Sequence, residues 1–137
     1  MNKAFVDTSV ILRILLQDDE LKRKAAEKLL RDSKKGGETL FLLPVAVMEV
    51  VWVLEKVYKF SKSKVREIVE AILNTPDLKV EMEEVFLRAI RDYAENNIKF
   101  ADALMAHWGI AQGLNTVYTF DAKHFKRVDG LTVKVPA

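Results

Sequence analysis

Acidic residues at four separated places in the chain have the types and contexts that bind hard cations. Asp7 follows the apolar run Ala4-Phe5-Val6, Asp121 follows a later β-rich run, Asp102 lies near the start of an expected helix, and Glu49 lies within an apolar one. Two carboxylates ~4 Å apart repel by about 4 kcal/mol at an effective dielectric near 20. If these acids converge, the cluster therefore needs protons or a divalent cation, and oxygen-only ligands favour Mg²⁺ or Mn²⁺ over zinc.

Three of these acids also have an ordinary structural explanation. Asp7 and Asp121 each stand between a strand and a helix, where an aspartate is a good N-cap. Asp102 lies in the first turn of its helix, where a negative side chain complements the positive end of the helix dipole. From the residues alone, capping and metal binding both stay open at these positions.

Glu49 is harder to explain by local structure. Its neighbours three and four positions away along the expected helix are all apolar: Val45, Ala46, Trp52 and Val53. A glutamate on that face is expected to point inward unless this part of the helix is exposed, and a buried ionised carboxylate needs a partner. If buried, Glu49 is expected to be paired with a Lys or Arg, of which Arg13 is one candidate, to be protonated, or to bind a metal ion.

Length and composition limit the class of protein. The 137 residues suit a single domain, 1–137, and 22 Lys and Arg against 20 Asp and Glu give a net charge of +2, too small to indicate a nucleic-acid binder by bulk charge. The absence of cysteine excludes disulfides, thiolate metal sites and a cysteine nucleophile. No export signal or membrane-spanning run is visible, so we expect a soluble cytoplasmic protein with no membrane partner.

Strands and helices are expected to alternate along the chain. The patterns predict strands at 4–6, 40–43, 78–81, 116–120 and 131–135, and helices from about 9, over 21–33, 45–57, 62–73, 83–94 and 101–112. In the second helix the ladder Leu21, Ala25, Leu29 predicts the buried face. This alternation indicates an α/β fold with a mostly parallel sheet, in which ligands bind at the carboxyl ends of the strands.

Four segments, in this order, resemble the PIN-domain family, and specifically the toxin ribonucleases of VapBC-type toxin–antitoxin pairs. They are FVDTSVIL at 5–12, VMEVVWVL at 47–54, FADALMA at 100–106 and TVYTFD at 116–121, with Phe125 beyond. Each motif alone is weak, but four in the same order are fairly specific, and together they cover nearly the whole chain.

The resemblance implies a three-layer α/β/α domain with ribonuclease activity. The family's acidic quartet falls on Asp7, Glu49, Asp102 and Asp121. It implies Mg²⁺ or Mn²⁺ as cofactor and in-line attack of an activated water on RNA, leaving a 5′-phosphate. It also implies a homodimer and a cognate antitoxin protein whose tail fills the cleft.

Further residues are given roles beside this quartet. Thr8, Ser9 and Thr119 are expected to orient the carboxylates or the attacking water, with capping or strand filling as the alternative. Some relatives carry a further acid where this chain has Lys99, and a cation there would favour one tightly bound metal ion over two. The cations expected to contact RNA phosphates are Arg13, Lys99, Lys123, Lys126 and Arg127. His124 is not needed as a general base where a metal activates the water.

Two other functions remain open at the level of sequence. A phosphatase of the haloacid-dehalogenase type also has an aspartate after its first strand, but it needs a second one two positions later, where Ser9 stands. A non-catalytic PIN-fold module for interaction or RNA binding is the second alternative, and the intact quartet argues against it.

Overall fold

The structure is a computed structural model that describes residues 2–137. The chain divides into two compact units, an N-terminal unit ending at Glu81 and a C-terminal unit from Met82 to Ala137, and each is described by itself. No helix in the described part of the chain is long and apolar enough to cross a membrane.

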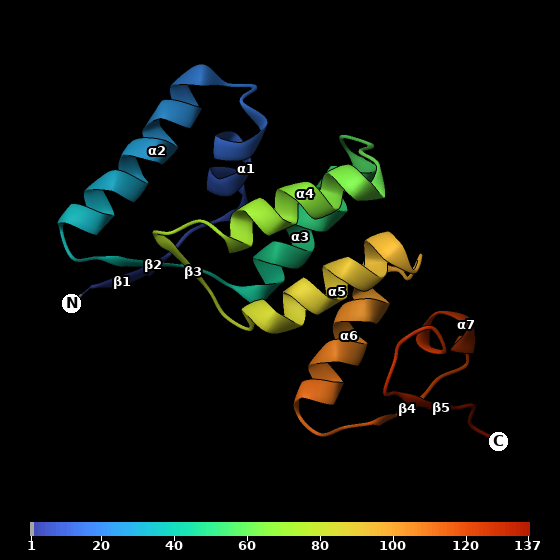
Figure 1. The fold of residues 1–137 in the computed structure, drawn as a ribbon. Coiled ribbons are helices and arrows are strands. Elements are labelled where there is room, and N and C mark those ends of the chain that lie inside the picture. The colour runs from blue at the N-terminus through green and yellow to red at the C-terminus, as the bar shows by residue number, and fades with distance from the viewer. Residues whose placement is uncertain (1) are drawn as a thin grey trace. The chain divides into compact units, whose positions relative to one another are not determined.

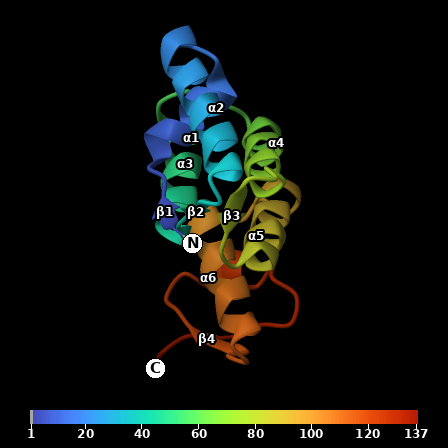
Figure 2. The ribbon, with the colours of Figure 1, turned by 90° about the vertical axis from the view of Figure 1, so that its left-hand side faces the viewer.

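The N-terminal unit alternates strands and helices (Figure 1). Its elements are β1 (Lys3–Phe5), α1 (Thr8–Leu16), α2 (Glu20–Lys35), β2 (Thr39–Leu42), α3 (Pro44–Lys56), α4 (Lys62–Leu73) and β3 (Leu78–Val80). The prediction for 62–73 matches α4 at both ends, because Ser61 caps the helix and its hydroxyl accepts a hydrogen bond from the Lys64 N–H at 3.2 Å. Figure 2 shows β1, β2 and β3 side by side.

The three strands form a parallel sheet in the order β1-β2-β3. Ala4 pairs with Leu40, and Leu40 pairs with Leu78, whereas Phe5 lies opposite Phe41. Leu40 and Leu78 are buried, whereas Phe5 is 70% exposed. The parallel sheet is as predicted. Because side chains alternate between the two faces of a strand, Phe5 lies on the less covered face although it belongs to an apolar run.

The buried face of α2 also differs from the prediction. Leu21 is 83% exposed and Ala25 is exposed, whereas the next residue, Ala26, is buried at 7%. Ala25, Ala26 and Leu29 all line an open pocket beside α1. Two of the three predicted stripe residues, Ala25 and Leu29, therefore line a pocket, and Leu21 is exposed, which the sequence pattern does not distinguish from close packing.

The C-terminal unit contains α5 (Glu83–Glu95), α6 (Phe100–Ala111), β4 (Thr116–Tyr118), α7 (Ala122–Phe125) and β5 (Thr132–Lys134), with β4 and β5 paired in parallel. Val85, Ala89 and Tyr93 of α5 are buried. The Tyr93 ring packs edge-on against Phe100 with ring centroids 6.0 Å apart, which joins α5 to α6. Gly113 follows α6 with a φ of 81°, the left-handed conformation expected of a residue that ends a helix.

Candidate active site

Asp7 is the N-cap of α1, at the end of the first strand segment. One carboxylate oxygen, Oδ2, accepts a hydrogen bond from the Ser9 backbone N–H at 3.2 Å. Hydrogen bonds from the Ser9 side chain and backbone lower the pKa of Asp7 below its ordinary value, so this exposed group is ionised at neutral pH. Capping is confirmed, and it does not exclude metal binding, because a carboxylate has about four lone-pair sites.

Thr8 ties the start of α1 to α3. Its side chain is buried, and Oγ1 donates to the Ala46 carbonyl oxygen at 3.5 Å, at the limit of a hydrogen bond. Ala46 lies one turn before Glu49 on α3. The Thr8 hydroxyl therefore contacts the backbone of α3, the helix that carries Glu49. Its expected role in orienting the carboxylates stays a prediction.

Glu49 is exposed, so it does not point inward and the stated exception, an exposed part of the helix, applies. α3 is apolar on two faces: Val47, Val50, Val51 and Leu54 are buried, whereas Val45, Met48 and Trp52 are exposed with Glu49. Apolar neighbours therefore did not indicate burial.

The pairing alternative for Glu49 also fails for its named candidate. Arg13 donates from Nη1 to Asp18 at 2.9 Å, and within the described residues of the N-terminal unit Glu49 has no ion pair. Its carboxylate is consequently available to a ligand from solvent.

The C-terminal unit carries the other two acids at the starts of helices. Asp102 is half-buried in the first turn of α6, as predicted. Asp121 is the exposed N-cap residue of α7, but its side chain makes no capping hydrogen bond. Instead Thr119 Oγ1 accepts from the Asp121 backbone N–H at 2.9 Å. Thr119 therefore positions the Asp121 backbone, and the carboxylate is not used for capping.

Two long-range hydrogen bonds hold α7 against the start of α6. Nδ1 of His124 accepts from the Lys99 backbone N–H at 3.0 Å, and Arg127 Nη1 donates to the Asn97 carbonyl oxygen at 2.7 Å. Sequence reasoning missed both, because nothing local connects residues so far apart. His124 therefore has a positioning role in the segment that carries Asp121, and one N–H group of Arg127 is engaged by the Asn97 carbonyl oxygen.

The four predicted metal-binding acids are divided equally between the two units. Asp7 and Glu49 lie in the N-terminal unit, and Asp102 and Asp121 lie in the C-terminal unit. Over residues 2–137 no group of three or more His, Asp or Glu side chains is placed to hold a metal ion. Convergence of the four carboxylates on one metal ion therefore stays a prediction.

Comparison with known proteins bears on the whole chain. The family model for the PIN domain matches residues 4–131. A VapC ribonuclease of Aquifex aeolicus (strain VF5) is 30% identical over 128 residues, which are 93% of each chain. A solved structure of VapBC2 from Rickettsia felis bound to a promoter DNA fragment covers all of both chains at 17% identity and a TM-score of 0.37, too low to carry an argument. The match over residues 4–131 agrees with the predicted α/β/α class, and the chain belongs to the PIN-domain family.

Proposed function

We propose that this protein is a divalent-metal-dependent endoribonuclease and the toxin of a toxin–antitoxin pair. The observation that carries the proposal is the 30% identity to a VapC ribonuclease, which extends over 93% of each chain. The PIN-domain match over residues 4–131 supports the same reaction class. All four acids predicted from the sequence are present within this aligned length.

Asp7, Glu49, Asp102 and Asp121 are the residues that would hold Mg²⁺ or Mn²⁺. They fit such an ion, because they are hard oxygen donors: Asp7 is ionised, Glu49 has no ion pair within its unit, and Asp121 makes no side-chain cap. When bound, the ion activates water and stabilises charge on the phosphate. Lys99 beside Asp102 lowers the negative charge there, which favours a single strong metal site.

RNA phosphates are the groups that surface cations would contact. Lys123 and Lys126 are exposed around α7, next to Asp121, and Lys99 is exposed at the start of α6. Arg13 is held by Asp18, and Arg127 by the Asn97 carbonyl, so each offers its remaining N–H groups. These contacts would supply the salt-dependent part of RNA affinity.

The partners follow from the same proposal. An antitoxin protein would inhibit the enzyme, and a homodimer is the expected assembly. The exposed apolar residues of α3, Val45, Met48 and Trp52, are consistent with a surface that a protein partner covers. An RNA substrate is consistent with action in the cytoplasm.

The proposal is tested by cleavage of end-labelled single-stranded RNA with Mg²⁺, with Mn²⁺ and with excess chelator. We expect cleavage with either ion, none with chelator, and recovery when Mn²⁺ is restored. Calorimetric titration with Mn²⁺ should show one strong site, which Asp7→Asn weakens. Metal-independent cleavage would contradict the mechanism. RNA binding without cleavage under any of these conditions would favour the non-catalytic module.

A further inference from the structure

A pocket of about 340 Å³ opens between α1 and α2 in the N-terminal unit. Its apolar lining comes from Val10 on α1 and from Ala25, Ala26 and Leu29 on α2. Ala25 and Leu29 belong to the stripe that the sequence predicts to be packed. The volume lies in the range of small-ligand sites, and the short side chains leave flat apolar walls.

The polar lining of this pocket is a hydroxyl and two cations. Ser9, Arg13 and Lys22 line it together with the apolar residues. Ser9 is also the residue whose backbone N–H donates to Asp7 Oδ2. The pocket therefore begins beside one of the proposed metal-binding carboxylates, and it is positively charged.

Arg13 is held in place by a carboxylate that has a second donor. Asp18 Oδ1 accepts from Arg13 at 2.9 Å, and Asp18 Oδ2 accepts from the Tyr58 hydroxyl at 3.2 Å. Tyr58 lies beyond the end of α3, so this contact joins segments 40 residues apart. A guanidinium has five N–H donors, so the bond to Asp18 leaves Arg13 able to bind an anion as well.

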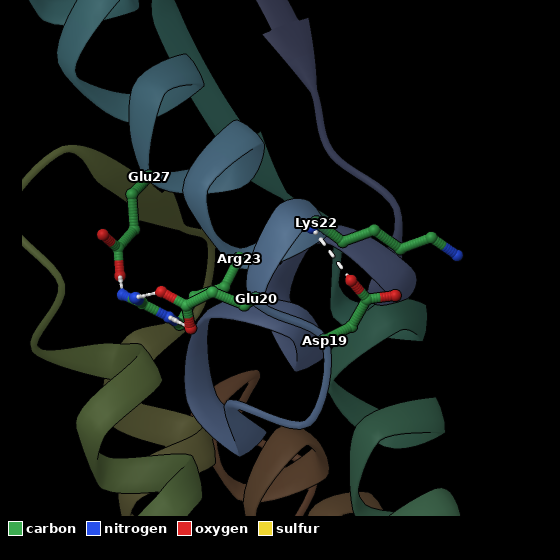
Figure 3. Close-up of polar contacts among 5 residues, drawn as sticks. All are labelled: Asp19, Glu20, Lys22, Arg23 and Glu27. Atoms are coloured by element: carbon green, nitrogen blue, oxygen red, sulfur yellow. Dashed lines mark hydrogen bonds and ion pairs between the residues drawn. The ribbon is translucent and has the colours of Figure 1, made fainter.

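Lys22 differs from the next residue, Arg23, in whether its charge is already neutralised. Figure 3 shows Arg23 between two carboxylates, those of Glu20 and Glu27, with the Glu27 contact at 2.7 Å. These hydrogen bonds raise the pKa of Arg23 further above its ordinary value. Lys22 is bonded to Asp19 through its backbone N–H, and its ammonium has no ion pair among the described residues of this unit.

We propose that the α1–α2 pocket binds one nucleotide of a single-stranded RNA substrate, next to the scissile phosphate that a metal ion at Asp7 would hold. The apolar walls of Val10, Ala25 and Leu29 receive the base, and Arg13 and Lys22 bind the adjoining phosphate. Two observations favour a nucleotide: the charge of the lining and its continuity with Asp7, since an apolar peptide would leave the Lys22 ammonium without a partner. The inference rests on the proposed ribonuclease function and adds a substrate-binding subsite to it.

The first test compares two neighbouring cations on α2. Lys22→Ala should weaken binding of a fluorescent single-stranded RNA several-fold and lower the slope of log affinity against log salt by about 0.7, the contribution of one phosphate contact. Arg23→Ala is the matched control, because its charge is already neutralised, and it should leave the affinity and the slope nearly unchanged. Equal effects of both substitutions would overturn the assignment of Lys22.

The second test fills the pocket. Ala25 is exposed and lines the pocket, so Ala25→Phe adds a ring there without entering the core. We expect about a tenfold rise in KM for RNA cleavage, larger than any change in kcat, with an unchanged thermal melting curve. Unchanged KM and unchanged RNA affinity would overturn the proposal. An altered molecular mass in solution with unaltered RNA affinity would do so as well, because it would identify the pocket as a contact between copies.

The experiments distinguish a wrong subsite proposal from a wrong ribonuclease proposal. If the unmodified protein cleaves RNA and both Lys22→Ala and Ala25→Phe match it, the subsite is wrong and the ribonuclease stands. If the unmodified protein cleaves no RNA with either metal ion, the proposed function is wrong. Binding of labelled RNA then still decides whether the pocket receives a nucleotide.

Discussion

The two units position their acidic residues by different means. In the N-terminal unit, Asp7 is fixed by a hydrogen bond from the first turn of the helix that it caps, two residues away. In the C-terminal unit, Asp121 makes no such bond, and the segment around it is held by His124 and Arg127, which bond to backbone groups 25 and 30 residues away. The first arrangement is local and the second depends on tertiary structure.

This difference predicts how each half responds to substitution. A local cap survives as long as another good capping residue replaces the original one. A variant of Asp7 can therefore lose the negative charge and keep the fold. Around Asp121 the backbone is placed by side chains, those of His124 and Arg127, that are not proposed metal ligands. Changes to those side chains should alter activity through geometry rather than through loss of a ligand.

The largest expected effect is loss of cleavage on removing one charge from either unit. Asparagine caps helices as well as aspartate does, so Asp7→Asn should retain the fold. Asp102→Asn keeps the volume of the side chain in α6. Both should lower RNA cleavage by more than roughly 100-fold, the upper end of the losses caused by groups that only support a metal ligand. Cleavage assays and circular dichroism check this, and full activity in either variant would refute the quartet.

A smaller effect is expected from the tertiary link in the C-terminal unit. His124→Ala removes the acceptor of the Lys99 N–H, which should cost about 1 kcal/mol of stability and lower kcat roughly tenfold. His124→Asn offers a side-chain oxygen as acceptor and should recover part of the loss. A KM effect without a kcat effect would instead indicate that His124 contacts RNA. Denaturant melts and steady-state cleavage separate these outcomes.

The corresponding link in the N-terminal unit should matter less. Thr8→Val keeps the shape of a buried side chain and removes a hydroxyl whose bond to Ala46 is 3.5 Å long. The expected cost is about 0.5 to 1 kcal/mol, with cleavage reduced by a factor of a few at most. Urea unfolding measures the first and the RNA assay the second. A loss of activity as large as that of Asp7→Asn would mean that Thr8 acts directly on the reaction.

Elements with complete local signals could be predicted from the sequence. α4 has a capping serine at its start and apolar residues at helical spacing, Val65, Ile68, Val69 and Ile72, all of which are buried. α3 was predicted to within one residue at each end, since Pro44 suits the first turn of a helix. Asp7 was recognised as a helix cap from three consecutive residue types.

The burial of individual side chains could not be predicted in two kinds of helix. One kind has apolar residues on two faces, as α3 does, and the other has no apolar face that is fully covered, as in α2. Glu49 was expected inside because its neighbours are apolar, yet the packed face of α3 is the one with Val47 and Leu54. Leu21 was expected inside because it begins a regular ladder, yet α2 is packed only around Ala26 and Ser33. The contact partner decides these cases, and it comes from another part of the chain.

The smallest expected effect concerns the one long-range side-chain contact identified beside the proposed nucleotide pocket. Burial, and then the hydrogen bond to the Asp18 carboxylate, raise the pKa of Tyr58 above its ordinary value. Asp18→Asn should lower that pKa, although the part due to burial stays. Ultraviolet titration of the phenolates, with Tyr58→Phe to assign the transition, measures the shift.

The sign of the stability effect follows from the raised pKa of Tyr58. A group whose pKa is higher in the folded state contributes stability below its unfolded pKa, near 10, and loses it as the pH rises through the folded value. The unmodified protein should therefore lose more stability on going above pH ~10 than Tyr58→Phe does. Equal alkaline losses would show that the Asp18–Tyr58 contact does not persist in solution. Arg13 would then lack the tertiary support that Tyr58 gives it through Asp18.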